Sequence, residues 1–103
     1  MQNKQKLIIK VPYVKVENMS SPSRSGGVVP NQFIINTDDG VYFQSYYSVI
    51  VARVGGKTYL DESKWDYSVT TGKYRNSFLG ETKKETEAKI KNGEYILTNL
   101  NGG

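Results

Sequence analysis

Three carboxylates, Asp61, Glu62 and Asp66, lie close together around the single tryptophan of the chain. Carboxylates at this spacing can act as a general acid and a general base, or they can hold a divalent metal ion. The chain has no histidine and no cysteine, which removes the commonest general base, the thiolate nucleophile and the sulfur-based zinc site. We therefore interpret these acids as solvated residues that precede a helix. The sequence predicts that the protein is not an enzyme and has no catalytic residue, metal site or cofactor.

Aromatic and basic residues are interleaved between residues 42 and 75. Such residues can stack bases and hold phosphates, as in single-stranded nucleic-acid-binding proteins. The same residue types dominate the binding hot spots of protein interfaces. They could also line a pocket that sequesters a small ligand, with Arg53 and Arg75 among the lining residues. The predicted partner-binding residues are Tyr47, Tyr59, Tyr67, Lys73, Tyr74 and Arg75.

Part of the aromatic set is expected to form the core of the domain rather than a binding surface. The predicted core positions are Phe43, Tyr46, Trp65 and Phe78.

The first part of the chain differs in composition from the rest. Residues 6–16 are rich in β-branched and aromatic residues and predict a strand, and Pro12 places this strand at a sheet edge or bends it. Residues 19–31 are rich in serine, proline and glycine and predict a flexible loop. We therefore expect residues 1–31 to form a basic N-terminal strand and a flexible loop, and residues 32–103 to form a compact domain.

Two hairpins are predicted after this loop. The first reverses at Asp38-Asp39-Gly40, where Gly40 can adopt the positive φ of a tight turn. The second reverses at Gly55-Gly56 and joins residues 46–54 to residues 57–60. Residues 46–54 are apolar on both alternating faces, which is typical of a central strand covered on both sides.

Two short helices are predicted in the second half. Thr70 or Thr71 can cap the first helix, and Gly80 can end it. The run Thr82-Lys83-Lys84-Glu85 is a capping box, which predicts a second helix over residues 83–91. With a last short strand over residues 94–98, the predicted fold class is α+β, an antiparallel β-sheet of four to five strands with two short helices.

The net charge is +4, and the basic excess lies before residue 61. A modest positive charge is compatible with nucleic acid, with an acidic protein surface and with no such partner at all. The apolar triplet Leu7-Ile8-Ile9 is far shorter than a signal peptide or a membrane span. We therefore expect a cytoplasmic protein that does not engage a membrane.

Two segments resemble a group of small uncharacterised phage and mobile-element proteins. These proteins carry a strand of the form F-x-S-Y-x-S-x-I, which corresponds to Phe43–Ile50, and the motif W-D-Y-S-x-T-T-x-K-Y-x-x-x-F-L, which corresponds to Trp65–Leu79. Two positions depart slightly from these proteins. Val51 intervenes before Ala52, and Gly72 stands at a site that often bears a larger polar residue. The resemblance covers residues 41–100 and implies a viral accessory protein in the cytoplasm of a host cell.

The leading hypothesis is a phage-type accessory binding protein that inhibits a host defence or regulatory protein by occlusion. A single-stranded nucleic-acid-binding protein and a small-ligand-sequestering pocket protein remain alternatives. The partner's identity and the oligomeric state stay open at this point.

Overall fold

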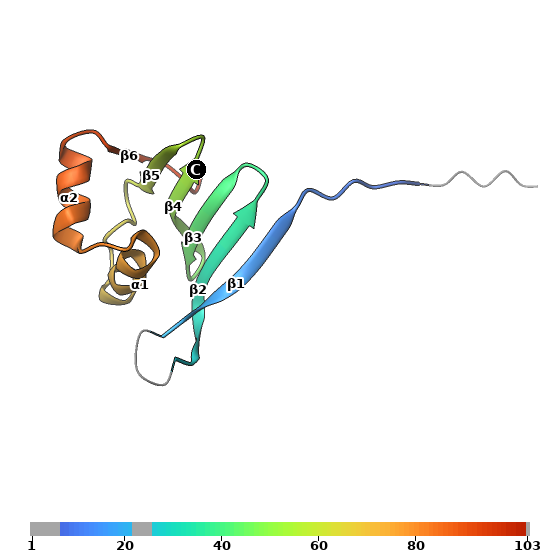
Figure 1. The fold of residues 1–103 in the computed structure, drawn as a ribbon, viewed down its shortest axis with the longest axis horizontal. Coiled ribbons are helices and arrows are strands. Elements are labelled where there is room, and N and C mark those ends of the chain that lie inside the picture. Colours follow the sequence, from blue (N-terminus) through green and yellow to red (C-terminus); the bar gives the residue numbers. More distant parts are fainter. Residues whose placement is uncertain (1–6, 22–25, 103) are drawn as a thin grey trace, which may run out of the picture.

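The computed structural model describes residues 7–21 and 26–102 of the chain. These residues form a six-stranded sheet with two helices (Figure 1). The strands lie side by side in chain order, and all neighbours are antiparallel except β5 and β6, which are parallel. The elements are β1 (Val14–Ser20), β2 (Val28–Thr37), β3 (Gly40–Ser45), β4 (Ser48–Val54), β5 (Lys57–Asp61), α1 (Val69–Leu79), α2 (Lys83–Lys91) and β6 (Tyr95–Thr98).

The parallel pair explains where the helices lie. Parallel strands cannot be joined by a tight turn, so the chain must cross one face of the sheet between β5 and β6. The helices α1 and α2 form this crossover, and Figure 1 shows both on one side of the sheet. The described residues thus form two layers, with the sheet as one and the helix pair as the other.

The core lies between these layers. Its buried apolar residues come from the sheet and from α1: Met19, Phe43, Ile50, Val51, Leu60, Tyr74, Leu79 and Tyr95. Phe43 of β3 stacks on Phe78 of α1 with ring centroids 5.7 Å apart. Aromatic truncations in such cores are among the most destabilising substitutions, so this contact anchors α1 to the sheet.

Both hairpins are present. Gly55 and Gly56 have φ values of 60° and 77°, as a two-residue turn of type I′ requires. The predicted turn at Gly40 is present, but the predicted positive φ is not, because Gly40 does not have a positive φ. A Cβ atom there would collide with the backbone carbonyl of Arg53 on the neighbouring strand, so glycine is required by the close approach of two backbones.

The helices begin and end near the predicted positions. Ser68, not Thr70 or Thr71, is the N-cap of α1, and its hydroxyl accepts a hydrogen bond from the Thr71 amide. Gly80 ends α1 with a φ of 69°. The capping box of Thr82 and Glu85 at the start of α2 is confirmed.

The fold class is α+β, as predicted, but the sheet has six strands and is mixed rather than antiparallel. The last strand was predicted over residues 94–98, but its parallel pairing with β5 depends on contacts between distant segments, which local sequence patterns do not report. Tyr46 is not a core residue, because it lies in the β3–β4 turn with a φ of 57° and is 40% exposed.

The N-terminal part also differs from the prediction. The first strand begins at Val14 rather than at residue 6, and residues 7–13 are exposed and form no strand. The predicted loop over residues 19–31 is shorter, because Met19 is buried and β2 begins at Val28; residues 22–25 lie outside the described residues. The predicted boundary between residues 31 and 32 falls inside β2, and β1 pairs along β2. The N-terminal strand is therefore part of the same sheet as the compact domain.

Among residues 7–21 and 26–102, neither helix has the length and apolar character needed to cross a membrane.

Candidate functional site

The three carboxylates lie at the end of β5, which includes Asp61, and in the segment between β5 and α1, which contains Glu62 and Asp66. The Asp61 carboxylate is 2% exposed and accepts hydrogen bonds from the backbone amides of Ser63, Lys64 and Leu100. It therefore holds the turn after β5 and ties it to the segment after β6. Glu62 is exposed, so the three acids do not converge on one point.

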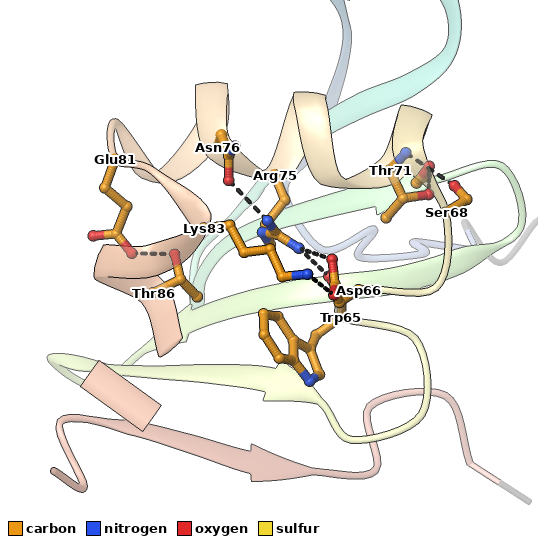
Figure 2. Close-up of polar contacts among 10 residues, drawn as sticks. Trp65, Asp66, Ser68, Thr71, Arg75, Asn76, Glu81, Lys83 and Thr86 are labelled. Atoms are coloured by element: carbon orange, nitrogen blue, oxygen red, sulfur yellow. Dashed lines mark hydrogen bonds and ion pairs between the residues drawn. The ribbon is translucent and has the colours of Figure 1, made fainter. Parts of the chain in front are cut away.

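Arg75 on α1 is 1% exposed and points into the loop before the helix (Figure 2). Its Nη1 donates to the Trp65 carbonyl oxygen at 2.7 Å and to Asp66 Oδ1 at 3.1 Å, and its Nη2 donates to Asn76 Oδ1 at 2.9 Å. The guanidinium also lies 5.1 Å from the centroid of the Trp65 ring. The prediction of Arg75 as an exposed partner-binding residue was wrong, because the residue is buried and both of its Nη atoms donate inside the domain.

Asp66 joins the two helices through its two carboxylate oxygens (Figure 2). Oδ1 pairs with Arg75 of α1, and Oδ2 pairs with Lys83 of α2 at 2.7 Å. Burial alone would raise the pKa of Asp66, but the hydrogen bonds from Lys83 and Arg75 outweigh it and lower the pKa below its ordinary value. The hydrogen bond to Asp66 in turn raises the pKa of Lys83. The loop, α1 and α2 are thus held in one arrangement.

Glu81, between the two helices, holds the other end of α2. It accepts hydrogen bonds from Thr86 Oγ1, from Lys89 Nζ at 2.6 Å and from the Tyr95 hydroxyl at 2.9 Å. Burial alone would raise the pKa of Glu81, yet these three donors lower it. Burial and the hydrogen bond to Glu81 raise the pKa of Tyr95. This cluster fastens α2 to β6.

A hollow of about 660 Å³ lies beside the Arg75 cluster, along the first turns of α1. We call it the α1 groove, and its lining residues are Asp66, Tyr67, Ser68, Val69, Gly72, Lys73, Arg75, Asn76 and Lys83. Val69 is 91% exposed, and Tyr67 and Lys73 are also exposed. The first turn of α1 carries no acidic residue, so the positive end of its dipole is not offset there. With Lys73 and Lys83 on its walls, the groove combines apolar surface with positive charge.

The structure does not bring the predicted partner-binding residues into one surface. Tyr67 and Lys73 line the α1 groove together. Tyr47 is 97% exposed in the β3–β4 turn, and Tyr59 is half-buried on β5. Tyr74 is buried in the core, so its prediction as an accessible residue was wrong, because it lies on the inward side of α1. Sequence reasoning missed Val69 and Lys83, since no local pattern tells that α2 folds back against the first helix.

No group of three or more acidic residues in the described part of the chain could hold a metal ion.

Comparison of the chain with curated proteins and with solved structures gave no match. A family model described as a family of unknown function, DUF8033, matches residues 14–94, which include every strand and helix except β6. The chain belongs to the DUF8033 family.

Proposed function

We propose that this chain is a phage-type accessory protein of the host cytoplasm that binds a host protein and inhibits it by occlusion. The docking surface is the α1 groove, and the partner presents an acidic segment with an apolar residue beside it. The observation that carries the proposal is the exposed pair Tyr67 and Val69 next to Lys73 and Lys83.

The electrostatics of the groove favour an acidic partner. The lining residues carry three cations, Lys73, Lys83 and Arg75, against the single acid Asp66. Because Arg75 and Lys83 both pair with Asp66, Lys73 is the cation that would face a partner. The N-terminus of α1 adds partial positive charge from its free amides. An acidic side chain that docks in the groove would lie next to Lys73 and to the N-terminus of α1.

Rigidity of the groove favours tight binding. Asp66 is tied to both helices, and the Trp65 carbonyl is tied to Arg75. Binding to a surface that is already ordered loses less conformational entropy than binding to a mobile one.

The single-stranded nucleic-acid alternative is less well supported. Such proteins stack successive bases on neighbouring aromatic side chains along a basic track. Here Tyr47 lies at the β3–β4 turn, Tyr74 is buried and Arg75 is enclosed, so the interleaved residues form no continuous track.

The small-ligand alternative is less well supported, because its two predicted arginines, Arg53 and Arg75, line different hollows. Arg75 already satisfies Asp66, Asn76 and the Trp65 carbonyl. Arg53, the other candidate, lies over the Phe78 ring, 5.6 Å from its centroid, and does not line the α1 groove.

The proposal is tested by affinity purification from host lysate after nuclease treatment, with the original chain and with Lys73→Glu. We expect a host protein to be recovered with the original chain and to be lost with Lys73→Glu. Lys91→Glu is the matched control, because it makes the same charge change on α2 outside the groove.

Direct binding to a fluorescent single-stranded oligonucleotide separates the alternatives. Affinity that falls with salt by a log-log slope of roughly 0.7 per phosphate, and that Lys73→Glu weakens, would support the nucleic-acid alternative instead. Recovery of a protein that all three chains retain equally would contradict the α1 groove as the docking surface.

A further inference from the structure

The sheet has a second face, on the side away from the helices. Phe43 points toward the helices because it stacks on Phe78, so its neighbour Tyr42 points to the other side. Strand register and alternation place further apolar residues on the same side as Tyr42: Val14, Val16, Ile35, Val49, Tyr59 and Ile96. We call this side the open face, and Figure 1 shows both helices on the opposite side of the sheet.

The open face is apolar and accessible. Val14 and Val16 are 54% and 56% exposed, and Tyr42, Val49 and Tyr59 are half-buried. A hollow of about 500 Å³ lies on it between β1 and β4. An exposed apolar patch that spans several strands is typical of an interaction surface. Because β4 is apolar on both faces and the helix pair covers only one, a second layer would complete the packing of this strand.

We propose that a second copy of the chain covers the open face, with the two sheets packed face to face around a two-fold axis. The exposed charged residues of this face lie at one end, at Asp38 and Asp39 in the β2–β3 turn and at Lys57 after the β4–β5 turn. Alternation also places Asp61 on this side, at the other end of β5, where it is buried and bonded to backbone amides. Its centre, where the two copies would meet, is formed by uncharged residues such as Tyr42, Ala52 and Val49. A two-fold contact places like residues near one another, and an uncharged centre makes this possible without repulsion.

The rim charges fit one orientation of the axis. If the axis runs parallel to the strands between β3 and β4, then β3 lies over β4 of the other copy and β2 lies over its β5. The β2–β3 turn then lies over the other copy's β4–β5 turn. This places Asp38 and Asp39 beside Lys57 of the second copy, twice in the dimer. The same axis lays Val14 and Val16 of β1 over Ile96 of β6.

The size of the face is adequate for a dimer. Six strands about 4.8 Å apart and about 20 Å long cover on the order of 600 Å² in plan. The side chains project from this plane, so the accessible area is larger than the projected area and approaches the roughly 800 Å² per partner of a standard interface. This inference does not rest on the proposed function, because the α1 groove lies on the helix side and stays free in such a dimer.

Sedimentation across a dilution series tests the inference. We expect the original chain to be a dimer that dissociates on dilution, and Ile35→Glu to be a monomer, because it places a charge at the centre of the contact. Val69→Glu is the matched control on the helix side and should remain a dimer. Circular dichroism checks that Ile35→Glu keeps its fold.

Cross-linking gives a second measurement that needs no substitution at the centre of the face. The chain has no cysteine, so a chain with Asp39→Cys can be mixed with a chain with Lys57→Cys and mildly oxidised. We expect a mixed disulfide dimer, and no such product when Tyr47→Cys, at the other end of the sheet, replaces Lys57→Cys.

Three results would overturn the inference: a monomeric original chain at all concentrations, a dimer that persists in folded Ile35→Glu, or a cross-link to position 47 in preference to position 57. In the second case, loss of the dimer in Ile9→Asp would assign the contact to residues 7–13.

Discussion

Arg75 and Trp65 meet in two ways at once: the Arg75 guanidinium donates to the Trp65 carbonyl oxygen at 2.7 Å, and it lies 5.1 Å from the centroid of the Trp65 ring. The loop after β5 is therefore closed onto α1 by a residue within the helix. Because the same guanidinium pairs with Asp66, which also pairs with Lys83, one buried cation orders the loop and both helices.

Substitution of Arg75 should therefore reduce stability rather than a binding affinity alone. Arg75→Ala leaves the Trp65 carbonyl and one Asp66 oxygen without their donor, and it opens space beside the indole. We expect the free energy of unfolding to fall by about 3 kcal/mol, at the lower end for a broken buried pair because the Asp66 side chain is partly exposed and still pairs with Lys83. Urea denaturation measures this loss. Lys73→Ala, two residues earlier and exposed, should change it little, and equal effects of the two substitutions would contradict the assignment.

Gln32 on β2 is fully buried, and neither its Oε1 nor its Nε2 has a hydrogen-bond partner among the described residues. It lies across from Ser45, whose hydroxyl is 2.8 Å from that of Thr71 on α1. A buried amide without partners costs on the order of 1–3 kcal/mol. We expect Gln32→Leu, which keeps a similar volume, to raise the thermal midpoint. A lowered midpoint would show that the Gln32 amide is bonded within the folded chain.

Gly40 should be the least replaceable glycine of the hairpins. Gly40→Ala forces a Cβ against the Arg53 carbonyl, and separating the backbones of β3 and β4 should cost roughly 1–3 kcal/mol. Gly56→Ala is the comparison, because nothing lies within 4 Å of its added Cβ and only its φ of 77° opposes a side chain. Chemical denaturation of both variants gives the order, and a smaller loss for Gly40→Ala would refute the steric reason.

The correctly predicted features are those that neighbouring residues determine. Gly55-Gly56, the Thr82 capping box and Gly80 each act within a few residues, so their types alone indicate a turn, a helix start and a helix end. The failures depend on distant residues. No residue near Arg75 in the sequence indicates that Trp65 and Asp66 fold against its side chain. A cation on a short polar helix is ordinarily exposed.

The same limit applies to the sheet and to the candidate site. The predicted last strand over residues 94–98 is present as β6, but its parallel pairing with β5 follows from the crossover through both helices. Lys83 becomes part of the α1 groove only because Asp66 holds it there. The aromatic residues were identified correctly as a mixture of core and surface, yet which of them are buried depends on where α1 packs.

The Glu81 side chain is 5% exposed and accepts hydrogen bonds from Lys89, Thr86 and Tyr95, so its contribution to stability should depend on pH. Since the pKa of Glu81 in the folded chain is lowered, below the roughly 4.3 of an unfolded chain, its contribution is complete above that pH. The contribution is lost as the pH falls through the pKa of Glu81 in the folded chain.

We expect Glu81→Gln to lower the thermal midpoint at neutral pH, because the uncharged amide no longer pairs with Lys89 and its NH₂ group faces the other donors. The difference in midpoint between the original chain and Glu81→Gln should stay constant from neutral pH down to about 5 and shrink below about 4.3. Because Asp66 is present in both chains, its own titration cancels from this difference. Calorimetry over this range measures the difference, with the exposed Glu62→Gln as the control that should follow the original chain. A difference that does not shrink in acid would mean that Glu81 acts through packing and not through its charge.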